Sequence, residues 1–311
     1  MPRLKKMGFD KLIEAAGFAG DVRYAEPMSG HTSLVIGGPA EAMAFPEDTG
    51  GLAGLRAAAH KNGVPVFLLG NGTNLLVKDG GIRGLVINIS KMDWIIKEPA
   101  AGMGAVVRAG AGTPLPKLAN FCANEGLSGL EFAAGIPGTV GGAVFMNAGA
   151  YGFEIKDVLY KIRLVREDGL VSDVNPGELE KGYRHGGIPS GSAVSEAWFS
   201  LTPGNAEEIK RRAAEFMAKR KTSQPLASKS AGSTFKNPPG MKAWKLIEEA
   251  GLKGTAVGGA AVSTKHANFL INQGGATAKD FMALMHLVKK TVKEKTGIAL
   301  EAEVRTVGID G

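Results

Sequence analysis

Residues 132–153 form a run of 22 positions without a single charged side chain. Such a neutral run has the length of a membrane-spanning helix, which needs about 20 apolar residues. However, the run contains six glycines and Pro137, and each of these weakens a helix interior by about 1 to 3 kcal/mol. A bilayer helix is therefore disfavoured. The run instead predicts a buried or ligand-lined loop, in which small residues bring backbone amides close to a polar group.

The composition is that of a globular protein with several domains. The chain has 311 residues, 44% of them hydrophobic and 22% charged, which is enough for about two or three domains. The net charge of +7 suits an anionic ligand. Lys and Arg are nevertheless scattered, apart from a denser run at 210–221 that fits the solvated face of a helix. We therefore expect no nucleic-acid partner.

Cys122 is the only cysteine, which limits the kinds of covalent and metal sites that the chain can form and indicates a reducing compartment. Neither an internal disulfide nor a cysteine-based zinc or iron–sulfur site can be built from it. The histidines show no metal-like spacing, so we expect no metal. The first residues lack the apolar core of a secretory signal. These features predict a cytoplasmic protein without membrane contact, and we expect a monomer.

Helical and strand patterns alternate along the chain and predict a mixed α and β fold. Helices are expected at 9–16, 48–62, 113–126, 206–221, 242–250 and 278–295. Strands are expected at 33–36, 64–69, 85–89, 105–109, 193–201, 267–271 and 300–307, with a hairpin at 159–174. The Thr-Pro-Gly-Asn sequence at 202–205 has the composition of a domain boundary.

A first glycine loop, residues 70–74, follows the strand expected at 64–69. Its sequence Gly-Asn-Gly-Thr-Asn matches neither the dinucleotide fingerprint G-x-G-x-x-G nor the P-loop, so both of those sites are disfavoured. Its successive amides can still form an anion-binding nest, to which Thr73 and Asn74 add side-chain donors. A simple turn at the end of a strand explains the loop equally well.

A second glycine loop, residues 135–142, is more informative. It combines Pro137 with four glycines and has no charge. A free phosphate would call for a cation, and none is present. The loop instead suits a ligand whose charge is met by amide dipoles and whose rings lie against apolar walls, which describes a dinucleotide. The residues alone do not distinguish a flavin from another dinucleotide.

Six motifs in order carry a resemblance that extends from about Tyr24 to Val307. They are Gly70-Asn-Gly-Thr-Asn-Leu-Leu-Val77, Gly135-Ile-Pro-Gly-Thr-Val-Gly-Gly142, Asn147-Ala-Gly-Ala-Tyr-Gly152, Gly182-Tyr-Arg184, Gly232-Ser-Thr-Phe-Lys-Asn-Pro238 and Leu300-Glu-Ala-Glu-Val-Arg305. In these motifs the chain resembles the UDP-N-acetylenolpyruvoylglucosamine reductases, also called UDP-N-acetylmuramate dehydrogenases.

The resemblance implies an α+β fold. A two-part FAD-binding region of the vanillyl-alcohol oxidase (PCMH) type would comprise subdomains at 1–84 and 85–204, followed by a substrate-binding domain at 205–302. The C-terminal strand at 303–311 would return to the first subdomain. Only 48 residues separate Arg184 from Ser233, which leaves no room for the tyrosine-bearing insertion of longer members. The chain thus resembles the short type, and the residue that replaces the covering tyrosine is left unassigned.

The resemblance also implies ligand-binding residues. FAD would be bound by Gly70, Asn71, Gly72, Thr73, Asn74, Leu75, Gly135, Ile136, Pro137, Gly138, Thr139, Gly141, Gly142, Asn147, Gly149 and Ala150. The UDP-sugar substrate would be bound by Tyr183, Arg184, Asn237 and Asn272.

The implied reaction is the reduction of UDP-N-acetylglucosamine enolpyruvate to UDP-N-acetylmuramate for peptidoglycan synthesis. NADPH would reduce FAD, hydride would pass from flavin N5 to the enolpyruvyl C3, and a proton would reach C2. The resemblance implies that Arg184 binds the substrate carboxylate, Ser233 donates the proton and Glu303 stabilises the enolate-like species.

Each of these three residues also has an ordinary structural interpretation. An arginine beside glycine and tyrosine is commonly an exposed loop residue, and a serine after glycine is commonly a turn residue. Glu303 lies on an alternating strand pattern whose polar face suits solvent. At the level of function, the alternatives are an FAD-dependent oxidase on the same fold and a non-catalytic nucleotide-binding protein.

Overall fold

The structure is a computed structural model of the chain, and it describes residues 6–99 and 104–311. The chain forms two compact units. The first comprises Met1–Tyr24, Ala42–Asn71 and Gly84–Arg220, and the second comprises Ala25–Glu41, Gly72–Arg83 and Lys221–Gly311. Both units draw on residues 1–84, so the three-part division expected from the sequence stays a prediction. The expectation about a secretory signal rests partly on residues 1–5, which lie outside the described residues.

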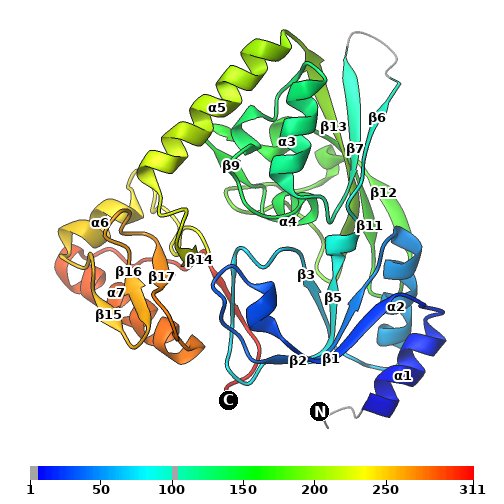
Figure 1. Cartoon of the computed structure of the whole chain (residues 1–311), viewed down its shortest axis with the longest axis horizontal. Coiled ribbons are helices and arrows are strands. Elements are labelled where there is room, and N and C mark those ends of the chain that lie inside the picture. Colours follow the sequence, from blue (N-terminus) through cyan, green and yellow to red (C-terminus); the bar gives the residue numbers. More distant parts are fainter. Residues whose placement is uncertain (1–5, 100–103) are drawn as a thin grey trace. The chain divides into compact units, whose positions relative to one another are not determined.

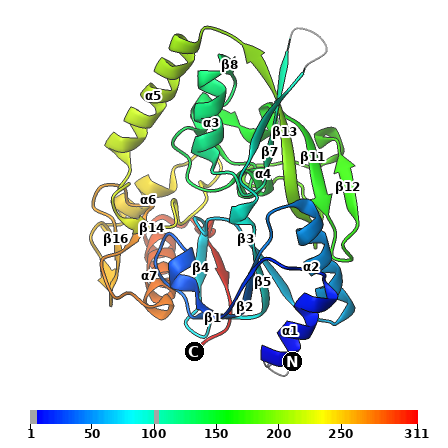
Figure 2. The same ribbon diagram turned by 45° about the vertical axis from the view of Figure 1, so that its right-hand side comes forward.

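The largest sheet of the first unit is antiparallel. Its order is β12 (Val171–Val174), β11 (Leu159–Val165), β13 (Ala193–Pro203), β7 (Ala105–Gly110) and β6 (Ile95–Glu98), and the short β8 (Leu127–Ser128) also pairs with β13. The antiparallel pairing of β11 with β12 confirms the predicted hairpin at 159–174. Helices α3 (Leu115–Asn124) and α4 (Val140–Phe145) lie on one face of this sheet (Figures 1 and 2).

A smaller sheet has the order β1 (Asp21–Pro27), β2 (Pro39–Phe45), β5 (Ile82–Asn88) and β3 (Val66–Leu69), with β3 and β5 parallel. The remaining long helices of the first unit are α1 (Lys6–Ala15), α2 (Thr49–Lys61) and α5 (Ala206–Ser223), which ends in the second unit. Helix α2 begins where its sequence predicts, because the Asp48 carboxylate accepts a hydrogen bond from the Gly51 amide at 2.7 Å.

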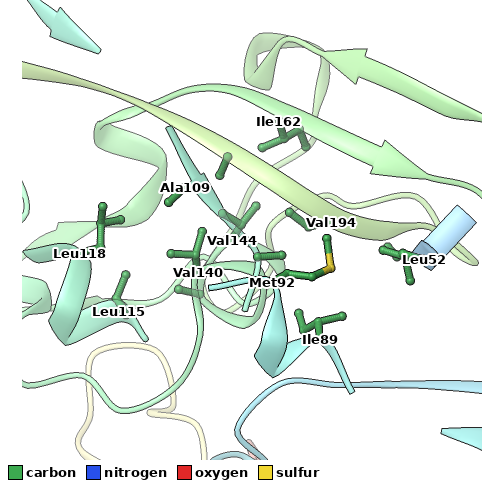
Figure 3. Close-up of a cluster of buried hydrophobic side chains, with 14 of the residues drawn as sticks. Leu52, Ile89, Met92, Ala109, Leu115, Leu118, Val140, Val144, Ile162 and Val194 are labelled. Atoms are coloured by element: carbon green, nitrogen blue, oxygen red, sulfur yellow. The ribbon is translucent and has the colours of Figure 1, made fainter. Parts of the chain in front are cut away.

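The core of the first unit joins α3 and α4 to the large sheet. Figure 3 shows Leu115 and Leu118 of α3 beside Val140 and Val144 of α4, with sheet residues such as Ala109 and Ile162 in the same cluster. Val140 and Val144 are buried and one helical turn apart. This burial anchors α4 although the helix is only six residues long.

The second unit has its own sheet and core. The sheet order is β14 (Lys229–Ser230), β17 (Leu270–Asn272), β16 (Ala260–Val262) and β15 (Ala256–Val257). It packs with helices α6 (Ala243–Glu249) and α7 (Ala278–Thr296). The buried residues of α7 recur at helical spacing: Phe281, Leu284, Met285, Val288 and Val292. A separate parallel pair joins β4 (Leu75–Val77) to β18 (Arg305–Val307).

Four sequence-based expectations are wrong in part. Of the strand expected at 267–271, only residues 270–271 lie in a strand, β17. Residues 33–36 are not a strand, because Val35 takes a φ of 57° and its amide donates to the Thr32 carbonyl in a turn. Within 300–307, only Arg305–Val307 forms a strand. The loop expected at 132–153 contains helix α4, which Thr139 caps by accepting a hydrogen bond from the Gly142 amide. No helix in the described part of the chain is long and apolar enough to span a membrane.

Cys122 provides a test of the first core. Its side chain is fully buried on α3, as the spacing predicts, and burial raises the pKa of the thiol to about 12. We expect Ellman's reagent at pH 8 to modify Cys122 on the order of 1,000-fold more slowly in the folded protein than in guanidinium chloride, because the thiolate is the reacting species. Rapid modification of the folded protein would contradict the packing of α3.

Candidate active site

The uncharged run 132–153 is fixed at its start by Glu131. Its carboxylate accepts hydrogen bonds from the Ser128 hydroxyl at 2.8 Å, the Gly129 amide at 2.7 Å and the Arg212 guanidinium at 2.7 Å. Burial alone would raise the pKa of Glu131, but these hydrogen bonds hold it below its ordinary value. Strand β8 and helix α5 thereby hold the entry to the second glycine loop.

The second glycine loop is bonded to the segment that leads into α3. The Val140 amide donates to the Thr113 carbonyl, and the Gly141 amide donates to the Ala111 carbonyl, both at 2.8 Å. A Cβ added at Gly141 would lie 2.9 Å from the Cβ of Ala111. Gly141 is therefore needed for close packing of these two segments, whereas a Cβ added at the exposed Gly142 would make only an ordinary contact with Thr139 Oγ1 at 3.5 Å.

Several amides of the two glycine loops remain available to a ligand. Within residues 6–99 and 104–311, the amides of Gly138, Thr139 and Gly72 donate to no protein acceptor. Gly138 and Gly72 take φ values of 124° and 59°, conformations that glycine adopts without strain. The unused amides of Gly138 and Thr139, which lie within the run without charged side chains, fit the pyrophosphate and ring system of FAD.

The first glycine loop contains two close approaches. A Cβ added at Gly70 would lie 2.6 Å from the Oγ1 of Thr139, so in the first unit the two loops pack against each other. A Cβ added at Gly72 would lie 2.1 Å from the His31 carbonyl oxygen in the second unit. A side chain at Gly72 would require backbone movement, and a side chain at Gly70 would displace the side chain of Thr139.

Asn74 joins the first glycine loop to the segment that carries Glu303. Its Nδ2 donates to the Glu303 carbonyl at 3.1 Å, and its own carbonyl accepts from the Arg305 amide at 3.1 Å. Leu75, which is buried, continues this pairing as the first residue of β4. The Asn74 side chain therefore braces the backbone around Glu303.

Ser233 and Glu303 lie on neighbouring antiparallel segments of the second unit. The Glu303 amide donates to the Thr234 carbonyl at 2.8 Å, and Phe235 forms a bridge with Ala302. Lys236 and Glu301, farther along these two segments, form an ion pair. The segments that carry the two sequence-predicted catalytic residues of this unit are therefore adjacent.

The Ser233 segment is also held on its other side, by the buried Asn268. The Asn268 carbonyl accepts from the Thr234 amide at 2.7 Å, and its side chain accepts from the Phe235 amide and donates to the Phe235 carbonyl. These bonds leave the backbone next to Ser233 little freedom. A partly exposed hydroxyl on a fixed backbone suits a proton donor.

Arg184 lies in the first unit, at the third position of a tight turn. Gly182 and His185 exchange backbone hydrogen bonds of 2.8 and 3.1 Å across this turn. Arg184 takes a φ of 57°, which is unusual for a residue with a side chain and recurs at functional sites. Its guanidinium lies 5.0 Å from the ring centre of Tyr183, which is about half exposed.

The other predicted ligand residues have clear structural positions. Gly149 and Ala150 form β9 of a two-stranded hairpin with β10 (Phe153–Glu154). Asn237 is exposed, and its Oδ1 accepts from the Ala243 amide at the start of α6. Ile136 packs against the core of the first unit, and Pro137 is exposed.

Asn272 differs from the other predicted substrate residues because it is buried. Its Nδ2 donates to the Leu34 carbonyl at 2.9 Å, and its Oδ1 accepts from the amides of Gly274 and Ala276. Its side chain is therefore engaged within the protein, which favours a structural role for this residue.

A group of side chains on α5 contacts Tyr151 and the second glycine loop, and no sequence pattern predicts it. Tyr151 stacks on Phe216 with ring centres 4.7 Å apart, and its hydroxyl donates to the Phe216 carbonyl. Gly135 lies against Arg220, whose pKa is lowered by burial, while Tyr151 opposes this shift and Arg184 adds to it. The charged run 210–221 suggested only a solvated helix, and no pattern signals that Phe216 contacts Tyr151 or that Arg220 lies against Gly135.

No cluster of histidine, cysteine, aspartate and glutamate in the described chain is arranged to hold a metal ion.

Comparison with known proteins shows first the class of protein to which the chain belongs. Residues 40–175 match the model of the FAD binding domain family. A solved structure of alkyldihydroxyacetonephosphate synthase has a TM-score of 0.50 at 16% sequence identity and matches 65% of this chain and 41% of its own, which shows the shared fold. The chain is an FAD-dependent oxidoreductase with a flavin-binding region of the PCMH type.

The C-terminal part and the whole-chain comparisons give the family. Residues 224–307 match the model of the UDP-N-acetylenolpyruvoylglucosamine reductase C-terminal domain. The UDP-N-acetylenolpyruvoylglucosamine reductase of Caldanaerobacter subterraneus subsp. tengcongensis is 46% identical over 300 residues, 96% of this chain and 97% of that protein. The crystal structure of the corresponding Thermus caldophilus reductase has a TM-score of 0.78 at 39% identity, over 92% of this chain and 98% of its own. The chain belongs to the UDP-N-acetylenolpyruvoylglucosamine reductase family.

Two adjacent glycines give a matched test of the second glycine loop. Gly141→Ala should lower the stability of the flavin-free protein by about 1 to 3 kcal/mol, because the new methyl group is forced against Ala111. Gly142→Ala should leave stability unchanged or raise it by about 0.5 to 1 kcal/mol, since its Cβ would meet only Thr139 Oγ1 at 3.5 Å. Thermal unfolding of the two variants measures both effects.

The same pair tests the position of the cofactor. If FAD lies against the exposed side of the loop, Gly142→Ala weakens FAD binding without loss of stability, as a fluorescence titration of the flavin-free protein would show. A stable Gly141→Ala variant, or an unstable Gly142→Ala variant, would contradict the packing described for α4.

Proposed function

We propose that this chain reduces UDP-N-acetylglucosamine enolpyruvate to UDP-N-acetylmuramate with NADPH, in the synthesis of peptidoglycan precursors. The observation that carries this proposal is the pairing of the Ser233 and Glu303 segments within one unit. In this proposal the enzyme acts as a cytoplasmic monomer on a UDP-sugar. The single cysteine supports a reducing compartment.

The FAD would be held by the two glycine loops. When bound, FAD would supply the redox chemistry, namely hydride transfer from NADPH to the enolpyruvyl C3 through flavin N5. The residues assigned to its binding are Gly70, Asn71, Gly72, Thr73, Asn74, Leu75, Gly135, Ile136, Pro137, Gly138, Thr139, Gly141, Gly142, Gly149 and Ala150, whereas the side chain of Asn147 is engaged within the protein. Among them, the unused amides of Gly138 and Thr139 give the clearest structural support.

Arg184 would bind the substrate carboxylate. Hydride addition at C3 places negative charge on C2 and its carboxylate, and fixed donors at that carboxylate lower the barrier most effectively. A guanidinium stays charged and donates two parallel hydrogen bonds to a carboxylate. The tight turn that holds Arg184 favours a fixed direction for these donors. Tyr183 and Asn237 complete the proposed substrate contacts, and the buried Asn272 would act on substrate binding only indirectly.

Ser233 would donate the proton that C2 requires, and Glu303 would stabilise the enolate-like species or return the proton to the serine. A hydroxyl donor needs no catalytic triad for this step, because it acts as an acid and not as a nucleophile. The antiparallel pairing around Thr234 supports this division of roles, since it fixes both residues on one rigid element.

The central test follows the two half-reactions on the purified protein. We expect a yellow protein that releases FAD on denaturation. Under anaerobic conditions NADPH should bleach the flavin, and UDP-N-acetylglucosamine enolpyruvate should restore the absorbance near 450 nm. Restoration by oxygen but not by this substrate would identify an oxidase, and a protein unable to take up FAD would exclude both enzymes.

Ser233→Ala should separate the two half-reactions. Loss of the proton donor should slow reoxidation by substrate about 100-fold or more, as expected for general acid catalysis, and leave reduction by NADPH within about 3-fold of the parent. Ser228→Ala, in the same unit and five residues earlier, serves as the control and should change neither rate. Equal losses in both half-reactions would contradict the assigned role.

A further inference from the structure

Asn147 lies at the end of α4 and joins three segments of the first unit. It is buried, with 1% of its surface exposed. Its Nδ2 donates to the Gly182 carbonyl and to the Glu154 carboxylate, both at 3.1 Å, and its Oδ1 accepts from the Lys156 amide at 3.0 Å. A side-chain amide has two N–H groups, so both donors are used by the protein.

These contacts argue against an Asn147 side chain that binds the cofactor, which is the role implied by sequence resemblance. No N–H group of the side chain remains for a ligand. Asn147 also takes a φ of 43°, an uncommon conformation in which asparagine is tolerated better than most residues. The surroundings therefore hold the residue in a strained conformation, which indicates that its position matters.

One side of Asn147 is a rigid support. The Glu154 amide donates to the Asp157 carboxylate at 2.8 Å in a reciprocal capping box of the short 3₁₀ helix Ile155–Asp157. The Ile155 amide donates to the Ala148 carbonyl at 2.9 Å, and the Ile155 side chain is buried. The partners of Asn147 on this side are therefore fixed independently of the Arg184 turn.

The other side of Asn147 is the turn that carries Arg184. The Gly182 carbonyl accepts hydrogen bonds from both the His185 amide and Asn147 Nδ2. Immediately after the turn, the Gly186 amide donates to the Phe145 carbonyl at 2.9 Å, and a Cβ on Gly186 would lie 2.0 Å from the Val144 carbonyl oxygen. The turn is thus attached at one end to Asn147, two residues beyond α4, and at the other to Phe145, the last residue of α4.

We propose that Asn147 is a positioning residue for Arg184, which holds the Gly182–His185 turn at the end of the helix that begins in the second glycine loop. This inference rests on the proposed function of Arg184. Loss of the tether would leave the guanidinium present but displaced, and a displacement of about 1 Å in a positioned group costs up to about 100-fold in rate.

The kinetic test uses Asn147→Gly, which accepts a positive φ and removes all three side-chain hydrogen bonds. In the FAD-loaded enzyme, reduction by NADPH should stay within about 3-fold of the parent, while reoxidation by the enolpyruvyl UDP-sugar should slow about 10- to 100-fold. Asn147→Asp, which keeps the acceptor for the Lys156 amide but loses both donors, should show the same split. Asn62→Gly, an exposed helix-end asparagine, is the control and should alter neither rate.

A double-mutant cycle separates positioning from a general structural effect. In an Arg184→Ala background, Asn147→Gly should slow reoxidation no further, because the group that it positions is already gone. Additive losses, or equal losses in the two half-reactions, would overturn the proposal.

Hydrogen exchange supplies a readout that does not depend on the substrate. Asn147→Gly should accelerate exchange at the amides of His185 and Gly186 in the FAD-loaded protein and leave amides of α3 unchanged. Unchanged exchange at these two amides would overturn the tether. If the parent enzyme is not reoxidised by the UDP-sugar, the proposed function fails, and the exchange experiment still decides whether Asn147 holds the turn.

Discussion

The first unit depends on one close contact between two stretches of backbone. Residues 138–141 lie against residues 111–115, and the amides of Val140 and Gly141 donate to carbonyls of that segment. The contact is possible because Gly141 has no side chain. It sets the start of α4, and the buried valines orient the helix against the sheet (Figure 3). Phe145 at the end of the helix and Asn147 just beyond it hold the turn of Arg184.

Local sequence and family motifs predicted different parts of this arrangement. Periodicity was sufficient for α7 and for the hairpin of β11 and β12, because their burial patterns repeat in register with the chain. It failed for α4, since Gly141 and Gly142 have low helix propensity and only the tertiary burial of Val140 and Val144 compensates. The family motifs indicated Arg184, Ser233 and Glu303 as catalytic residues, but motif position carries no information about hydrogen-bond partners. The tethers made by Asn147 and Asn74 therefore appear only in the structure.

In the motifs 70–77 and 147–152, the asparagines and the glycines have different roles. Glycines leave backbone amides exposed for a ligand, whereas Asn74 and Asn147 direct their side chains toward segments that carry Glu303 and Arg184. An asparagine suits this task because one planar group both donates and accepts, and it adds no charge beside a site of hydride transfer. Motifs assigned to cofactor binding thus also hold the segments that carry Glu303 and Arg184.

The composition of the second unit has a consequence for biosynthesis. Its core includes Leu34, Ile36 and Leu76, which are buried together with residues of α6 and α7 from the last third of the chain. On a translating ribosome these early apolar residues are synthesised long before their partners. Strand β4 likewise emerges long before β18, with which it pairs. Contacts of such long sequence separation form slowly and leave apolar surface exposed in the meantime. The unit that carries Ser233 and Glu303 is therefore expected to be the part of the nascent chain that relies most on chaperones.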